Sequence, residues 1–264
     1  MNLKDCDSSI ALEPALARYL LPNIPHQMVQ KMKKNKIQTD EGLNKLFDAL
    51  GQEIVYAQIY YKLFRELVES IPEYEHEFQE SNTFWTLTLD SLRKAWHTQM
   101  CRIFDQTRSS LNLLSFLKII KANQRLFDEV HFRRHLGDNA PADLVVELYH
   151  ALREQQLDKD ILSVSRKNPL VEKLWRQRNS IVAHLDPMVL LGESRVLEEN
   201  PLSKTEIEIL LDLSLAIINR YSNLYRSSEW SRQIIGHEDY QWLLKLFRLG
   251  LQRFHDDRFG KDSL

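Results

Sequence analysis

The sequence predicts an all-α protein, built as a bundle of amphipathic helices. Seven glycines and eight prolines in 264 residues supply few of the tight turns that an all-β or an alternating α/β chain requires. Several long segments also carry apolar residues at the 3.6-residue period of a helix that buries one face. With 43% apolar residues, the chain can bury one large helical core.

Capping signals place the ends of several helices. Pro72 ends the first one, because its ring cannot continue an α-helix. Asn168 followed by Pro169 is typical of a helix start, and Ser203 with Glu206 has the spacing of a capping box. The predicted helices span about residues 39–71, 81–105, 112–135, 142–157, 168–184, 204–226 and 238–255.

These helices divide the chain into three parts. Residues 1–38 contain three of the prolines and are expected to form an N-terminal arm. Residues 39–226 are expected to form the main helical domain, and residues 227–264 a C-terminal helical extension packed on the same domain. The fold class is therefore a helical bundle with additional N- and C-terminal helices.

Composition excludes several classes of protein. The formal net charge is only -2, so no global field attracts nucleic acid, and any RNA contact needs a local patch. Cys6 and Cys101 are too few for a disulfide framework. Apolar runs fall short of the ~20 residues that cross a bilayer, and the N-terminus lacks the apolar core of a signal peptide. We expect a cytoplasmic protein without a membrane partner.

One candidate for chemistry is the segment RNSIVAH, which places Arg178 and His184 near the end of a predicted helix. Spacing alone is weak evidence, because 19 arginines and nine histidines give about 0.65 such pairs by chance. Arg125 and His131 have the same five-residue gap. The position of Arg178 is more informative, since it lies at the centre of an apolar helical stripe. That stripe consists of Val171, Leu174, Trp175, Ile181, Val182 and Leu185.

An arginine among apolar groups requires a partner, because burying an uncompensated charge costs several kcal/mol. Two roles are open for Arg178. It can form a structural ion pair with a carboxylate of a neighbouring helix, for example Asp105, or its planar guanidinium can bind phosphate oxygens. Both can hold at once. His184, in the last helical turn, suits proton transfer because the helix dipole favours its charged form; the other interpretation is a capping or surface residue.

These residues resemble the Arg-polar-x-x-x-x-His signature of the HEPN superfamily, with Asn179 as the polar residue. Ala183-His184-Leu185-Asp186 is similar to its abortive-infection U-type branch, AbiU. Upstream, Arg102-Ile-Phe-Asp105 and the following SSLNLLSFLKII are similar to a second segment of that branch. Ser180 stands where the branch commonly has lysine. The resemblance covers roughly residues 40–225.

The resemblance implies a HEPN-like helical bundle that forms a homodimer through the motif helices and cleaves RNA without metal. Such a metal-independent endoribonuclease would act as a toxin or phage-defence effector, with an inhibitory protein (an antitoxin) as a candidate partner. His184 would transfer protons and Arg178 would stabilise the transition state. Asn179 would position the substrate, and Asp186 would orient His184. Asp105 and Arg102 would support the site.

Two alternatives remain beside this interpretation, and one further group of residues can contribute to either function. His131 and His135 lie one helical turn apart, as metal ligands can, but cations separate them and no cysteine is near; we expect no metal and no cofactor. A non-catalytic module can use the same dimer face to bind RNA or protein. Finally, a run of cations and aromatics can form an RNA-stacking patch or simply the core and rim of a long helix. That run contains Arg220, Tyr221, Tyr225, Arg226, Trp230 and Arg232.

Overall fold

The computed structural model describes residues 40–107, 109–127, 155–178, 202–231, 236 and 238–260. Within these ranges all regular elements are helical, which confirms the predicted fold class. No helix in the described ranges combines the length and the apolar content that crossing a membrane requires. The elements are α2 (Asp40–Ser70), α3 (Glu75–Glu80), α4 (Asn82–Ile103), α5 (Leu113–Ala122), η2 (Gln124–Phe127), α8 (Gln155–Ser163), α9 (Pro169–Gln177), α12 (Lys204–Arg226) and α13 (Asp239–Phe259).

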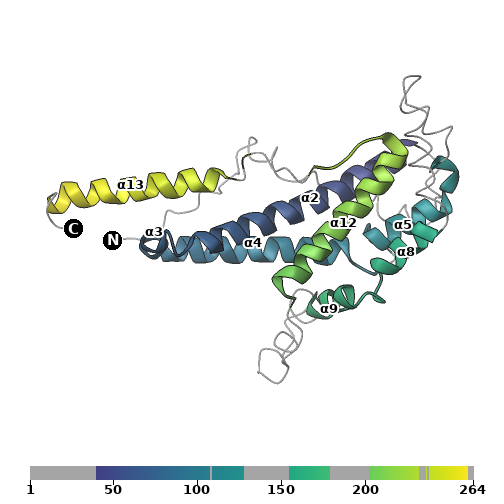
Figure 1. Cartoon of the computed structure of the whole chain (residues 1–264), viewed down its shortest axis with the longest axis horizontal. Helices are drawn as coiled ribbons and strands as arrows, with labels where there is room; N and C mark the ends of the chain where they lie inside the picture. Colours follow the sequence, from purple (N-terminus) through teal and green to yellow (C-terminus); the bar gives the residue numbers. More distant parts are fainter. Residues whose placement is uncertain are drawn as a thin grey trace, which may run out of the picture.

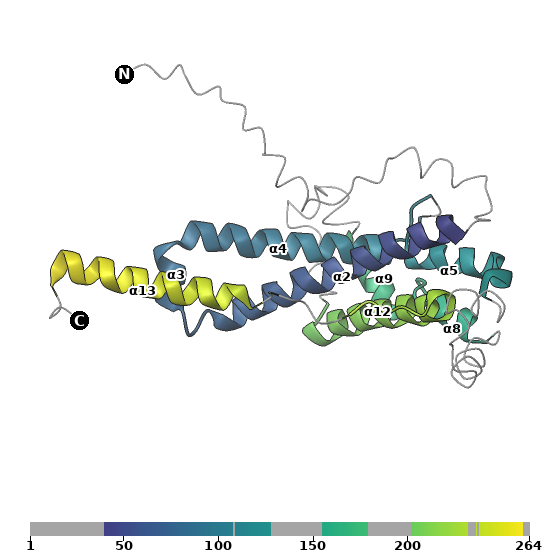
Figure 2. The same ribbon diagram turned by 90° about the horizontal axis from the view of Figure 1, so that it is seen from above.

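Two long antiparallel helices, α2 and α4, form the axis of the molecule (Figures 1 and 2). Their facing sides are apolar, with Phe47 and Ile54 of α2 and Met100 of α4 fully buried. Midway along the pair, the rings of Tyr61 and Trp96 meet edge to face, with centroids 5.4 Å apart. Side chains of this kind stabilise a fold by the apolar area they remove from water. The pair therefore supplies the main part of the core.

The long helix α12 packs along α2 and closes this core. Its predicted capping box is confirmed: Ser203 Oγ accepts a hydrogen bond from Glu206 N (3.2 Å), and Glu206 Oε2 accepts one from Ser203 N (2.8 Å). Near the other end of α12, the buried ring of Tyr225 stacks on Phe47 at 5.5 Å. The predicted bounds of this helix are correct.

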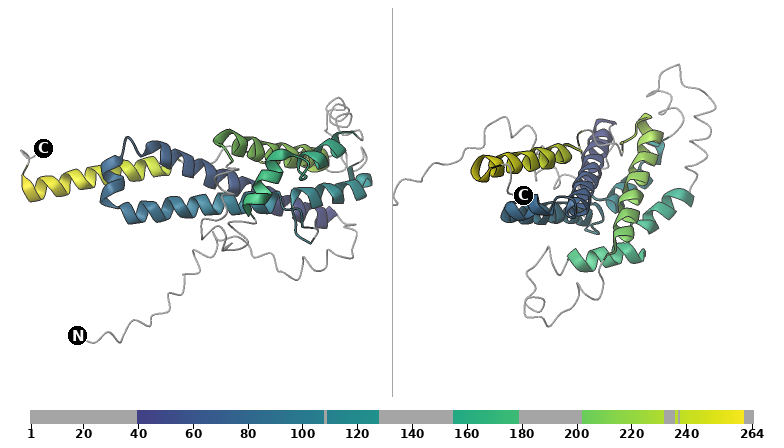
Figure 3. Two further views of the ribbon diagram at one scale, coloured as in Figure 1. Left: turned by 90° about the horizontal axis from the view of Figure 1, so that it is seen from below. Right: turned by 60° about the vertical axis from the view of Figure 1, so that its left-hand side comes forward.

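A buried carboxylate joins α8 to α12. Asp160 is nearly inaccessible to solvent, and its Oδ2 accepts hydrogen bonds from Arg220 Nη1 (2.5 Å) and Tyr221 Oη (2.8 Å). Gln156 Nε2 donates to Oδ1 at 2.9 Å. Three donors offset the desolvation cost of the buried charge. Asp160 thus holds α8 on α12. Both α8 and α9 lie toward the end of the bundle away from α13 (Figure 3).

The opposite end of the α2–α4 pair carries α3 and α13. Leu244 of α13 is fully buried in a cluster with Phe78 of α3 and Trp85 of α4. Arg248 of α13 lies over the ring of Tyr74 and forms an ion pair with Glu77 of α3, with Nε and Oε1 2.6 Å apart. These contacts fix α13 on the turn between α2 and α4.

The predicted elements differ from the observed ones at a few places. The short helix α3 was not predicted. The helix expected at 112–135 breaks at Asn123, whose N–H donates to Ile120 O and whose Nδ2 donates to Ile119 O. The end predicted near residue 157 is wrong, since α8 continues to Ser163, and α13 continues to Phe259. The arm at 1–38 and the whole of 128–154 lie outside the described residues.

Gly51 of α2 is required by a close contact with Trp230. A Cβ on Gly51 would lie 2.2 Å from Cε2 of the indole. The backbone of Trp230 is held on both sides by Asn219, which accepts from Trp230 N (2.8 Å) and donates to Trp230 O (3.0 Å). These bonds fix the backbone of Trp230, so a side chain at position 51 could be accommodated only by rotating the indole out of its packed position.

We expect Gly51→Ala to destabilise the protein by about 1–3 kcal/mol, because overpacking outweighs the ~1 kcal/mol that alanine gains in a helix. Gly250→Ala is the matched control: it is also a helical position, but nothing lies within 4 Å of its added Cβ. It is expected to leave stability unchanged or raise it by up to ~1 kcal/mol. Urea unfolding of both variants measures the difference. Equal effects of the two substitutions would show that Trp230 does not constrain Gly51.

Candidate functional site

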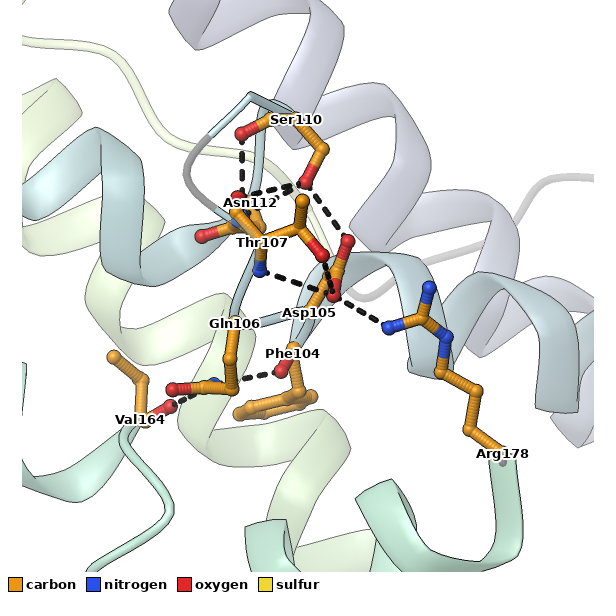
Figure 4. A network of polar contacts seen from close by, with 8 residues as sticks. All are labelled: Phe104, Asp105, Gln106, Thr107, Ser110, Asn112, Val164 and Arg178. Carbon is orange, nitrogen blue, oxygen red and sulfur yellow. Dashed lines mark hydrogen bonds and ion pairs between the residues drawn. The ribbon is translucent and has the colours of Figure 1, made fainter. Parts of the chain in front are cut away.

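The candidate site is built around Asp105, in the loop that follows α4. This carboxylate is buried and accepts several hydrogen bonds within its own loop (Figure 4). Oδ1 accepts from the backbone N (3.2 Å) and from Oγ1 (3.0 Å) of Thr107. Oδ2 accepts from Ser110 Oγ at 2.8 Å. The side chain of Asp105 thus organises the turn that leads from α4 toward α5.

Two further polar side chains fix this loop. Asn112 Nδ2 donates to the backbone oxygens of Thr107 (3.0 Å) and Ser110 (3.1 Å), while its Oδ1 caps α5 by accepting from Ser115 N at 2.8 Å. Gln106 Nε2 donates to Val164 O at 3.1 Å, which ties the loop to the segment between α8 and α9. Because side chains satisfy most of its polar groups, the loop holds Asp105 in one position.

Arg178 reaches Asp105 from the end of α9. That helix begins at Asn168, whose Oδ1 accepts from Leu170 N (3.0 Å), and packs its buried Val171 and Leu174 on the core. Arg178 still has helical backbone angles, and its Nη1 donates to Asp105 Oδ1 at 2.5 Å (Figure 4). The Arg178 side chain is 31% exposed and that of Asp105 10%. The sequence had suggested Asp105 as the partner of Arg178, and the structure contains this ion pair.

The surroundings of Asp105 change how its carboxyl titrates. Burial by itself would raise the pKa of Asp105, but hydrogen bonds from Ser110 and Thr107 and the charge of Arg178 outweigh it, so the pKa lies below its usual value. Cys101, one helical turn earlier, is buried, and burial raises the pKa of its thiol to about 12. The thiol is therefore neutral at physiological pH and is a poor nucleophile.

His97 also lies at the junction of α4 and α9, and the sequence had not pointed to it. Its side chain is hydrogen-bonded to that of Gln177, the buried residue that precedes Arg178. Burial lowers the pKa of His97; the bond to Gln177 acts in the opposite direction, and the charge of Arg93 adds to the lowering. A neutral imidazole is thus favoured at this contact between α4 and α9.

The other predicted site residues lie in several places. Arg102 forms an ion pair with Glu53 of α2, with Nη2 and Oε1 2.9 Å apart, so it braces α4 on α2 three residues before Asp105. His184, Asn179 and Asp186 lie outside the described residues, as do His131 and His135 of the alternative metal pair. In the part of the chain that the structure describes, no three His, Cys, Asp or Glu side chains gather as a metal site would need.

The structure gives the predicted RNA-stacking residues of α12 another role. The rings of Tyr221 and Tyr225 are buried in the core, so neither offers a face on which an RNA base can stack. Arg226 forms an ion pair with Asp48 of α2 (2.7 Å), and Arg220 pairs with Asp160. These residues therefore act as core and rim of a long helix, the second interpretation given above. Arg232 lies outside the described residues.

The two buried ion pairs are nearly identical. Arg178 and Arg220 each place an Nη1 2.5 Å from a carboxylate oxygen, and their side chains are 31% and 32% exposed. The carboxylates of Asp105 and Asp160 are 10% and 6% exposed. An arginine in such a pair can thus serve packing alone. Contact geometry does not distinguish Arg178 from Arg220, so the sequence around each arginine must do so.

The lowered pKa of Asp105 predicts a dependence of stability on pH. Its ionised form stabilises the fold above the unfolded pKa of about 3.9, and this contribution is lost as pH falls through the lower folded pKa. Asp105→Asn should cost about 1–3 kcal/mol at neutral pH, since buried donors lose a charged acceptor. It should also flatten the fall in stability below about pH 4 in urea unfolding. The control is Asp158→Asn, which removes an exposed pair with Lys121 and should cost less than ~1 kcal/mol. A wild-type acid slope retained in Asp105→Asn would contradict this assignment.

Comparison with known proteins supplies the sequence evidence. A family model described as AbiU2, of the HEPN type, matches residues 40–242. No curated protein and no solved structure matches the chain. The matched range is more than half of the chain and contains both the loop of Asp105 and the segment from Arg178 to His184, which confirms the resemblance seen in the sequence. The chain belongs to the HEPN_AbiU2 family.

Proposed function

We propose that this protein is a metal-independent endoribonuclease that acts as a toxin or phage-defence effector in the cytoplasm. Membership of the HEPN_AbiU2 family supports a role in RNA cleavage or abortive infection. The observation that supports the finer proposal is Arg178, held by the buried carboxylate of Asp105 at the end of α9. It lies in a family motif segment, whereas Arg220, in an equivalent ion pair, does not.

The geometry suits a phosphate contact. A guanidinium has five N–H donors, and the bond to Asp105 uses one of them. Asp105 is itself fixed by Thr107 and Ser110, so the orientation of Arg178 is set before a substrate arrives. With 31% of its side chain exposed, Arg178 remains accessible to a ligand. A preorganised donor of this kind stabilises developing negative charge at no cost of reorganisation.

The proposed reaction is an attack of a ribose 2′-oxygen on the adjacent phosphorus. The bond between O2′ and phosphorus forms while the bond from phosphorus to the 5′-oxygen breaks, leaving a 2′,3′-cyclic phosphate and a 5′-hydroxyl. One neutral His184 takes the proton of the 2′-hydroxyl, and the protonated His184 of a second copy of the chain gives its proton to the leaving 5′-oxygen. Arg178 offsets the extra negative charge of the transition state, with Asn179 and Asp186 as positioning residues.

This chemistry gives a physical reason for a dimer. The attacking and leaving oxygens lie on opposite sides of the phosphorus, so a single imidazole cannot serve both. Two copies related by a two-fold axis would supply one histidine to each side. An inhibitory protein that covers this face would hold the enzyme inactive.

A second candidate function is a non-catalytic module that binds RNA or protein through the same face. The observation that favours it is the close similarity of the Arg178–Asp105 and Arg220–Asp160 pairs, because the second pair is a packing element. Fold and family do not establish activity by themselves. Assays of cleavage and of binding separate the two functions.

Purified protein is expected to cleave RNA, and His184→Ala or Arg178→Ala should reduce the rate at least ~10²-fold. Arg178→Lys keeps the charge beside Asp105 but loses the planar fork, so it should remain folded and still lose most activity. Arg125→Ala, at an exposed arginine of η2 with the same spacing to a histidine, should retain wild-type activity. Gel-based cleavage rates, with circular dichroism as a check of folding, test this. If wild type binds RNA without cutting it, the second candidate function is correct.

Cleavage should persist in excess EDTA and leave a cyclic phosphate, because the proposed groups are side chains only. Mass spectrometry of a short RNA after digestion identifies the two new ends. Activity that disappears on chelation and returns with a divalent cation would overturn the metal-independent reaction while leaving RNA cleavage in place.

A further inference from the structure

Helix α13 exposes a large apolar face. Leu244 is fully buried against α3 and α4, and at 100° per residue the exposed apolar residues all lie in a sector about 140° wide that excludes Leu244. This sector contains Trp242 (67% exposed), Leu243 (52%), Leu246 (63%), Leu249 (61%) and Phe254 (60%). Figures 1 and 2 show that α13 projects beyond α3.

The size of this face fits a protein interface. The five side chains together expose roughly 600 Å². Monomeric proteins rarely expose contiguous apolar patches larger than a few hundred Å², and a standard interface buries about 800 Å² per partner. One helix therefore carries most of the apolar area that a stable contact needs.

The charges of this segment argue against two kinds of occupant. Between residues 238 and 260 there are four acidic and four basic side chains, so the net charge is zero. A helix that lies on an anionic membrane requires a cationic excess. A strongly charged protein partner would find no complementary field. Both signs of charge occur along the exposed face itself, which is the pattern of a self-complementary surface. The acidic residues are Glu238, Asp239, Asp256 and Asp257, and the basic ones Lys245, Arg248, Arg253 and Arg258.

We propose that α13 pairs with α13 of a second copy of this chain, antiparallel and about a two-fold axis at Leu246. In that register Leu246 meets its own copy, and Leu243 lies opposite Leu249. The large Trp242 lies opposite Gly250, which has no side chain and has open space around it.

The same register places Asp239 opposite Arg253. Both are exposed and both belong to the apolar sector. Among the residues that the structure describes, Arg253 pairs only with Asp257 of its own helix, at 4.0 Å and with 86% and 75% of the two side chains exposed. Such a contact is worth little. In an isologous interface, each residue must find its complementary residue in a second copy of the same sequence. Helix α13 meets this requirement with Leu246 at the centre and with an Asp239–Arg253 pair on each side.

This surface is separate from the proposed RNA-cleaving site. Helix α13 and the end of α9 that carries Arg178 lie toward opposite ends of the α2–α4 pair (Figures 1 and 2). Pairing through α13 therefore neither requires RNA cleavage nor excludes a second dimer contact through the motif helices.

Cysteine cross-linking of the full chain tests the axis. In a Cys6→Ser background, Leu246→Cys should form an intermolecular disulfide under mild oxidation, because residues on a two-fold axis come within disulfide distance. Gln252→Cys, exposed on another side of α13, is the control and should stay monomeric on a non-reducing gel. Equal cross-linking of the two variants, or none at Leu246→Cys, would overturn the proposal.

Charge reversal tests the register. Sedimentation experiments should show an association of the wild type that Leu246→Glu abolishes. Asp239→Arg and Arg253→Asp should each raise the dissociation constant of that association at least tenfold. The double variant Asp239→Arg/Arg253→Asp should restore it to within about threefold, because the ion pairs re-form with opposite polarity. Singles without effect, or a double variant as weak as the singles, would reject this pairing. Co-sedimentation of wild type with anionic lipid vesicles, lost in Leu246→Glu, would point to a membrane instead.

Discussion

The buried carboxylate of Asp105 is the interaction on which the rest of the candidate site depends. A charge removed from water at this position must be compensated by donors, and three residues supply them. Thr107 and Ser110 bind it from its own loop, and Arg178 binds it from α9. The loop in turn positions Asn112, which starts α5. The buried carboxylate of Asp105 thereby determines the path of the chain between α4 and α5 and the position of the end of α9.

Sequence patterns predicted the elements whose signals are local. The bounds of α12 follow from a capping box and a regular apolar stripe, and the long period of α2 could hardly be misread. Helix α3 was missed because six residues are too few to show a period. The break at Asn123 was missed because it depends on bonds from that side chain and backbone to residues only three and four positions earlier, which an apolar pattern does not report.

For the site, the sequence suggested Asp105 as one possible partner of Arg178 but did not indicate the place of His97. An arginine within an apolar stripe requires a carboxylate partner, and the structure identifies Asp105 as that partner. His97 became part of the junction only through its contact with Gln177, 80 positions along the chain. The stacking patch on α12 failed for a different reason: aromatic residues at helical spacing pack a core as well as they bind a base. Tyr221 and Tyr225 do the former.

The high local concentration of α13 near α3 explains why a few contacts are enough to hold this helix. Trp230 is anchored on α2 beside Gly51, and α13 begins only nine residues later. A tether this short keeps the helix at an effective concentration in the millimolar range near α3. Leu244, Tyr240 and the pair of Arg248 with Glu77 are therefore enough to hold it, although the same contacts between separate molecules would dissociate at once. Because the chain between Trp230 and α13 keeps the helix in place, most of the surface of α13 does not need to pack within its own chain and stays exposed.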